Sequence, residues 1–78
     1  PVTTISYELP LESYVTVNIY DILGNKVMDV LSKNQKAGYK TFDWRATNNT
    51  GERVSAGIYF YSIESRKFKQ TKKMILLK

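Results

Sequence analysis

The chain contains neither cysteine nor histidine among its 78 residues. The lack of cysteine excludes a disulfide framework and a thiolate metal site, so an apolar core has to hold the fold together. The lack of histidine removes the commonest zinc ligand and the commonest general base. Any catalysis would depend on carboxylate, lysine, tyrosine or serine side chains, and we expect no cofactor.

Long apolar runs are absent as well. No run approaches the roughly 20 residues that a membrane-spanning helix needs. The N-terminus lacks the basic and then apolar layout of a secretory signal peptide, and it begins with proline rather than methionine. We therefore expect one small domain, residues 1–78, that is a fragment of a larger secreted protein with its signal peptide upstream.

The positive charge is concentrated at the end of the chain. Residues 66–78 carry six lysine or arginine residues and no acid, whereas residues 1–65 carry six basic and seven acidic residues. The whole net charge of +5 therefore comes from the C-terminal segment. Such a charge allows weak, salt-dependent contact with anionic lipopolysaccharide or phosphate, but it gives no specificity.

Apolar and polar residues alternate along most of the chain, which is typical of half-buried strands. Turn residues at 21–25 and 47–51 separate several of these segments. Residues 32–38 are polar and are expected to form a connection between sheets. The predicted strands are residues 4–9, 14–20, 26–31, 39–44, 58–64 and 68–77, with an irregular edge segment at 53–57. This pattern predicts an all-β, immunoglobulin-like antiparallel β-sandwich of about seven short strands, with a small five-stranded barrel as the alternative.

Aromatic and branched residues are the expected source of buried area, with Trp44 at the centre of the core. The segment from Ile58 to Glu64 is too apolar to face water, so we place it centrally in its sheet. The predicted core residues are Val17, Ile19, Phe42, Trp44, Ile58, Phe60, Met74 and Leu76.

Five segments, in this order, closely resemble the C-terminal sorting domain of type IX secretion cargo. They are residues 1–10 (PVTTISYELP), 17–27 (VNIYDILGNKV), 37–44 (AGYKTFDW), 57–61 (GIYFY) and 72–76 (KKMIL). The same pattern is similar to the immunoglobulin-like domain of flagellar hook-capping proteins. In sorting domains an Asn-Pro-Phe-Asn-Pro segment usually precedes the first strand, and Pro1 matches only the last residue of that segment. Any cleavage site is therefore expected upstream of residues 1–78.

The resemblance implies a non-catalytic, folded secretion signal of the kind usual in Bacteroidetes and relatives. The implied partners are the type IX outer-membrane translocon and its shuttle components, a surface sortase-like peptidase, and the upstream cargo domain of the same chain. The implied location is secreted or on the cell surface, reached through the periplasm. The second hypothesis is a structural spacer or a hook-cap-like assembly module without a sorting role.

The resemblance also implies which residues a translocon would recognise. Its recurring motifs fall on a glycine-bracketed turn, on the Gly57 segment and on the C-terminal strand. The recognition candidates are Gly24, Gly57, Tyr59, Lys72, Lys73, Met74, Ile75, Leu76 and Lys78. The alternative for the terminal lysines is protection of an edge strand against pairing with other chains. An unprotected edge would instead allow dimerisation by strand pairing.

Other chemical interpretations of the sequence are weaker. The aromatic run at 59–61 beside basic residues would suit nucleic-acid stacking, but such residues more often build the core of a small sandwich, so no nucleic acid is expected. Asp21, Asp29 and Asp43 lie on separate segments without calcium-loop spacing, so no metal is expected. Glu8 and Glu12 have no partner that would make them a catalytic pair. We therefore predict that the domain is not an enzyme.

Overall fold

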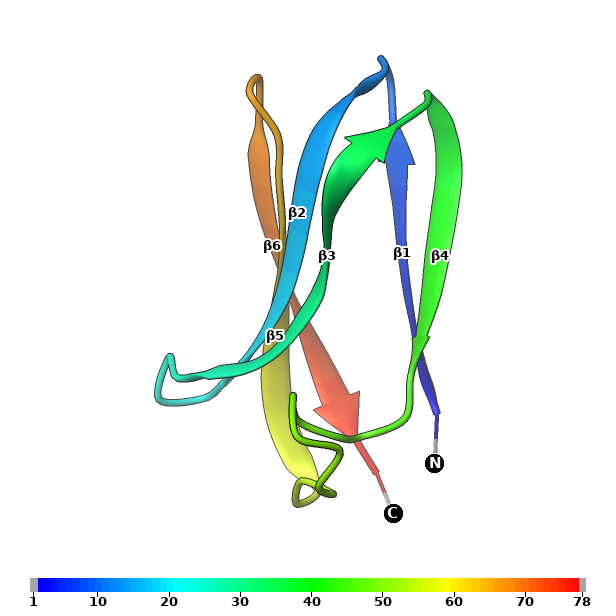
Figure 1. The fold of residues 1–78 in the computed structure, drawn as a ribbon. Helices are drawn as coiled ribbons and strands as arrows, with labels where there is room; N and C mark the ends of the chain where they lie inside the picture. Colours follow the sequence, from blue (N-terminus) through cyan, green and yellow to red (C-terminus); the bar gives the residue numbers. More distant parts are fainter. Residues whose placement is uncertain (1, 78) are drawn as a thin grey trace.

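The fold is an antiparallel β-sandwich without a helix, described over residues 2–77 by a computed structural model (Figure 1). None of these residues belongs to a helix of the length and apolar character that crossing a membrane requires. The strands are β1 (Thr3–Leu9), β2 (Ser13–Asp21), β3 (Lys26–Gln35), β4 (Gly38–Trp44), β5 (Gly57–Glu64) and β6 (Lys69–Leu76). The prediction of an all-β antiparallel sandwich is confirmed, but the described residues form six strands, one fewer than expected. The predicted edge segment at 53–57 forms only an isolated bridge between Thr47 and Arg53.

The strands form two layers of unequal size. β1 pairs with β4 in a two-stranded sheet, and the larger sheet has the order β3-β2-β5-β6. β1 begins and β6 ends at the same end of the sandwich (Figure 1). The central position predicted for the segment from Ile58 to Glu64 is confirmed, because β5 pairs with both β2 and β6.

β3 extends further than its apolar pattern predicts. Residues 32–35 are polar and were expected to belong to a connection, but they continue the ladder opposite Ser13 to Thr16 of β2. The hydroxyl of Tyr7 in β1 donates a hydrogen bond of 2.5 Å to Oε1 of Gln35, which ties this end of β3 to the opposite sheet. Backbone pairing, rather than apolar periodicity, determines the length of the strand here.

The core lies between the two sheets around Trp44, as predicted. Its indole is 1% exposed, contacts the Tyr59 ring edge-to-face at 5.2 Å between centroids, and donates a 2.8 Å hydrogen bond to the carbonyl oxygen of Thr47. The predicted core residues Val17, Ile19, Met74 and Leu76 are also buried, and Phe42 is half-buried against them. The remaining buried hydrophobic residues are Ile5, Tyr7, Leu9, Val15, Ala46, Tyr59, Tyr61 and Ile63.

The prediction for the inward face of β5 was wrong. Ile58 is 36% exposed and Phe60 is only half-buried, whereas Tyr59, Tyr61 and Ile63 face the core. Both faces of this strand are apolar, so alternation does not identify the inner one. Pairing decides the question, because Tyr59 lies opposite buried Met74 and Ile58 lies opposite exposed Ile75.

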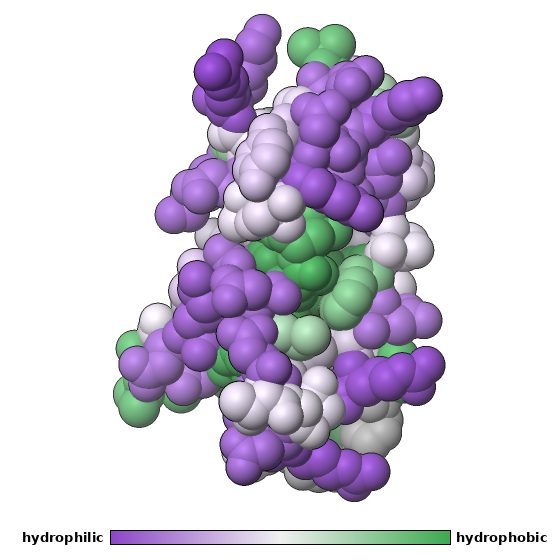
Figure 2. Space-filling model, viewed as in Figure 1, coloured by the Kyte–Doolittle hydropathy of each residue, from purple (hydrophilic) through white to green (hydrophobic). Residues whose placement is uncertain are grey.

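The two sheets leave apolar surface visible where β3 and β4 border one another. Figure 2 shows a hydrophobic area at the middle of this face, surrounded by hydrophilic residues. Half-buried residues of these two strands pack on the core, among them Val30, Leu31 and Phe42. β3 pairs only with β2 and β4 only with β1 within the described residues, so this side of the sandwich is not closed by a backbone ladder.

A matched pair of substitutions tests which face of β5 is buried. Ile63→Val removes a methylene from a fully buried site and should lower the free energy of unfolding by about 0.5–1.5 kcal/mol. Ile58→Val makes the same change on the outer face of the same strand and should stay within about 0.5 kcal/mol of the parent. Urea denaturation of both variants measures the difference. A larger loss for Ile58→Val would contradict this assignment of the faces.

Candidate functional site

The outer edge of β6 presents the terminal lysines that the sequence singled out. β6 pairs with β5 on one side and with no other strand of the described chain on the other side. The five residues from Lys69 to Lys73 are exposed, including Gln70 and Lys72, whose side chains point toward the side of the sheet that carries the core. The small sheet does not cover this half of β6, so an edge and both faces of the strand are open.

The rest of the C-terminal motif divides between surface and core. Met74 and Leu76 are 8% and 1% exposed and pack inside, so they are core residues in the folded domain. Ile75 points outward and is 58% exposed. Lys78 lies outside the residues that the structure describes. Among the recognition candidates at this end, the folded surface therefore presents Lys72, Lys73 and Ile75.

Gly24 belongs to the tight turn between β2 and β3. Its φ of 88° lies in the left-handed region, where glycine is favoured. Oδ1 of Asp21 accepts hydrogen bonds of 2.9 Å from the amides of both Leu23 and Asn25. These contacts account for Gly24 and Asp21 by local structure.

Gly57 and Tyr59 have structural roles at the start of β5. Gly57 adopts a φ of 147°, and open space surrounds the position that a Cβ would take, so the backbone conformation alone favours glycine there. Tyr59 is 6% exposed, and its hydroxyl donates a 2.6 Å hydrogen bond to the carbonyl oxygen of Ser55. Tyr59 is therefore a buried structural residue of the folded domain, and its role in recognition stays a prediction.

An apolar strip runs across the outer face of the large sheet near the end of β6. Ile58 and Ile75 are paired neighbours on this face, and the next row places Tyr20, Phe60 and Lys73 side by side. The sequence pattern did not indicate this strip, because Ile58 and Phe60 were predicted to lie in the core. The sequence does show that both faces of β5 are apolar. Only the pairing of β5 with β6 shows which of the two faces points outward.

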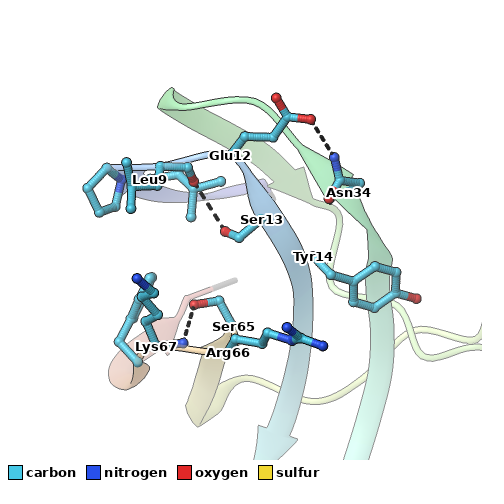
Figure 3. A pocket seen from close by; sticks show the side chains of 11 residues that line it. Leu9, Glu12, Ser13, Tyr14, Asn34, Ser65, Arg66 and Lys67 are labelled. Carbon is cyan, nitrogen blue, oxygen red and sulfur yellow. Dashed lines mark hydrogen bonds between the residues drawn. The ribbon is translucent and has the colours of Figure 1, made fainter.

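A shallow pocket lies at the opposite end of the sandwich. It has a volume of about 390 Å³ and lies between the β1–β2 connection and the β5–β6 turn (Figure 3). Nδ2 of Asn34 donates a 2.8 Å hydrogen bond to Glu12, and the Ser13 hydroxyl donates to the carbonyl oxygen of Leu11. Arg66 and Lys67 from the turn also line it. The serine and the carboxylate are thus engaged separately and form no nucleophile–base pair.

The three aspartates considered for calcium have separate structural roles. Asp21 caps the β2–β3 turn, Asp29 forms a 3.0 Å ion pair with Lys26, and Asp43 accepts a 2.9 Å hydrogen bond from the Thr4 hydroxyl. The hydrogen bond and charge of Lys26 lower the pKa of Asp29. Within residues 2–77 no three metal-ligating side chains come together.

Burial perturbs two tyrosine hydroxyls on the inner face. Desolvation raises the pKa of Tyr7, which its hydrogen bond to Gln35 partly offsets, and desolvation alone raises the pKa of Tyr61. Tyr61 lies directly opposite Lys72 in the β5–β6 ladder. Both groups are neutral at physiological pH, so they are packing groups rather than acids or bases of a reactive site.

Two comparisons with known proteins address the identity of the fold. The model of the FlgD Ig-like domain family matches residues 3–68, which is most of the chain. The chain belongs to the FlgD Ig-like domain family. The match ends at Phe68, before β6 begins. The predicted relation to the hook-cap immunoglobulin-like domain is thereby confirmed.

A solved structure agrees with this assignment. The crystal structure of FlgD from P. aeruginosa is similar to the chain with a TM-score of 0.77 and 25% sequence identity. The similarity covers 97% of this chain and 60% of that one, so the chain spans about three fifths of the FlgD that it matches. No curated protein matches the chain. Neither match concerns type IX sorting, so that resemblance stays a prediction.

The Asp21 cap provides a test of the turn that carries Gly24. Asp21→Ala removes the acceptor of two backbone amides and should cost about 1 kcal/mol of stability. Asp21→Asn keeps an oxygen in that place and should cost clearly less. Urea denaturation compares the two variants, and equal losses would show that the carboxylate charge, not the hydrogen bonding, holds the turn.

The Tyr61 hydroxyl predicts a pH dependence of stability. Its pKa is higher in the folded chain than in the unfolded chain, so its stabilising effect is complete below about pH 10 and is lost as the pH rises through the folded pKa. Tyr61→Phe should therefore lose less stability between pH 9 and pH 11 than the parent, while Tyr7 still contributes. Urea denaturation across this range measures it. Parallel losses in both proteins would contradict the assignment.

Proposed function

We propose that the domain is a non-catalytic, hook-cap-like assembly module that connects a larger protein to its partners. The observation that carries this proposal is membership of the FlgD Ig-like domain family over residues 3–68. The similarity of the whole sandwich to FlgD from P. aeruginosa supports it. A domain of this kind acts by presenting rigid surfaces, and no chemical step is required of it.

The sandwich is suited to that task by its construction. The aromatic contact between Trp44 and Tyr59 fixes the two sheets against each other, so the outer surfaces keep a constant relation. Surfaces suited to contact include the open edge of β6 and the apolar strip around Ile58 and Ile75. Exposed apolar area bordered by charge is typical of protein-binding surfaces.

A second candidate function is the type IX sorting signal implied by the sequence resemblance. One observation favours it: the exposed basic edge of β6 lies beyond Phe68, outside the residues that the family model matches. The shared family fold therefore leaves the Lys72–Lys73 pair unexplained. In this function the translocon and its shuttle components would bind the folded domain, a sortase-like peptidase would process it, and the cargo would reach the cell surface.

Deleting residues 1–78 from the protein that carries the domain, in its own cell, separates the two functions. As an assembly module, the domain is needed after export, so the shortened protein should still leave the cell or reach its compartment but no longer fractionate with its complex. As a sorting signal, its loss should leave the protein in the periplasm. Cell fractionation with immunoblotting measures both. Normal assembly of the shortened protein would overturn the main proposal.

A reporter gives the reciprocal test. A fluorescent protein with a signal peptide is fused to residues 1–78 and produced in a bacterium with a working type IX system and in a translocon-null strain. The assembly function predicts periplasmic fluorescence in both strains. Surface or medium fluorescence in the competent strain alone would establish sorting. Replacing residues 1–78 with an unrelated folded β-sandwich provides the control for passive export.

A further inference from the structure

The free edge of β6 combines three features that favour pairing with another strand. An edge strand presents a row of backbone N–H and C=O groups without ladder partners. The residues of β6 from Lys69 to Lys73 are exposed on both faces of the strand, which leaves room for the side chains of an added strand. A polar hollow of about 360 Å³, lined by Tyr7, Gln70 and Lys72 among others, lies beside it between β6 and β1.

The charge on this edge is unbalanced. Residues 66–77 contain five basic residues and no acid. Lys69 lies 3.8 Å from the carboxylate of Glu64 in the neighbouring strand, and within residues 2–77 neither Lys72 nor Lys73 takes part in an ion pair. Two lysines that point to opposite faces of the same edge are thus available to a partner.

These lysines disfavour a second copy of the chain as the partner. If two β6 strands paired side by side, the lysines of one would lie opposite or diagonal to those of the other. Like charges in such cross-strand positions are destabilising. The lysines therefore protect this edge against pairing with the β6 edge of a second copy. The same positive charges favour pairing with a negatively charged strand.

We infer that β6 accepts an extended, acidic segment of a partner protein as an additional antiparallel strand. The inference rests on the proposed function, because it takes the domain to be a protein-binding module, and it names the chemistry of the partner. Backbone hydrogen bonds would provide affinity, and side chains opposite the lysines would provide selectivity. Antiparallel addition is preferred because every pair in this sandwich is antiparallel.

The ladder specifies the pattern of the partner segment. An antiparallel partner runs in the opposite direction to β6, so its residues meet Lys73 first, then Lys72 and then Lys69. The residue opposite Lys72 directly follows the residue opposite Lys73. The residue opposite Lys69 lies four positions after the residue opposite Lys73. Acidic residues are expected at these three positions. The residue two positions before the first acid lies opposite Ile75, which is 58% exposed, and is expected to be apolar. It would extend the apolar strip of the outer face.

One acidic residue of the domain opposes this binding. Glu8 of β1 lines the same hollow as Lys72. Its charge would repel an acidic strand on that side, so Glu8→Gln should tighten binding about twofold to threefold. Glu8→Gln is therefore expected to raise the affinity for the acidic strand. A substitution that merely disturbed the fold would lower that affinity, so this variant distinguishes the two effects.

The probe is the capped peptide Thr-Val-Thr-Glu-Glu-Thr-Thr-Glu-Thr, which places valine and three glutamates in the required register. The complete 78-residue chain, labelled with ¹⁵N, is titrated with it and followed by NMR. We expect saturable shifts of amides along β6 and β5 and slower hydrogen exchange of β6 amides. A peptide of the same residues in an order that breaks the register should bind at least tenfold more weakly.

Charge-reversed variants test the role of the lysines. The double variant Lys72→Glu/Lys73→Glu should weaken binding at least tenfold, about threefold or more for each lysine. The matched control is Lys33→Glu/Lys36→Glu, which makes the same charge change at two exposed lysines, one in the last part of β3 and one directly after the strand, and should change affinity less than threefold. A peptide with lysines in place of its glutamates should restore binding to the β6 double variant.

Backbone methylation distinguishes an added strand from simple attraction between charges. Two peptides are N-methylated at alternate residues, one at its odd-numbered positions and the other at its even-numbered positions. Alternate amides of a strand point to opposite sides, so only one of the two peptides has the amides that face β6 blocked. Only that peptide should lose binding. Equal binding of both peptides, equal binding of the reordered peptide, or shifts confined to the Arg66–Lys67 turn would overturn the inference.

The outcome is separable from the test of the proposed function. If the peptide fails to bind while deletion of residues 1–78 still abolishes assembly, the domain is an assembly module that uses another surface, and the inference about β6 is wrong. If the deletion has no effect on assembly but the peptide binds with these properties, the edge is a binding site and the assembly role is wrong.

Discussion

The contact between Trp44 and Tyr59 is the interaction on which the rest of this sandwich depends. It joins the small sheet to the large one, since Trp44 ends β4 and Tyr59 lies near the start of β5. Each ring also fixes a loop by a hydrogen bond, Trp44 to the carbonyl of Thr47 and Tyr59 to that of Ser55. A domain of 78 residues without disulfides holds its two sheets together through its apolar core, and this contact lies within that core.

The unequal size of the two sheets determines where the surface is open. A two-stranded sheet cannot cover all of a four-stranded one, so the first half of β6 is exposed on both faces while Met74 and Leu76 are buried. Lysines occupy this uncovered half. The basic segment of the sequence is thus tolerated because it lies where the core ends, and the same position makes it available to a partner.

Family membership and surface chemistry address different parts of the molecule. The FlgD Ig-like match accounts for residues 3–68 and for the sandwich. The net positive charge of the chain lies mostly after Phe68. It is carried on β6, whose pairing with β5 is part of the same fold. The proposed assembly role rests on the family match, and the proposed chemistry of a partner rests on this charge. Sorting would require that a translocon recognise this same edge.

The sequence by itself determined where the six main strands lie along the chain, the central place of β5, the burial of Trp44 and the basic C-terminal edge, because alternation, turn residues and charge are local properties. Only the tertiary structure decided which face of β5 is buried, since Ile58 and Tyr59 are both apolar and a shift of one residue exchanges them. The extension of β3 to Gln35 was equally hidden, because pairing with β2 and the Tyr7 hydrogen bond stabilise polar residues there. The division of the C-terminal motif into buried Met74 and Leu76 and exposed lysines also needed the second sheet, because burial depends on what lies opposite a strand.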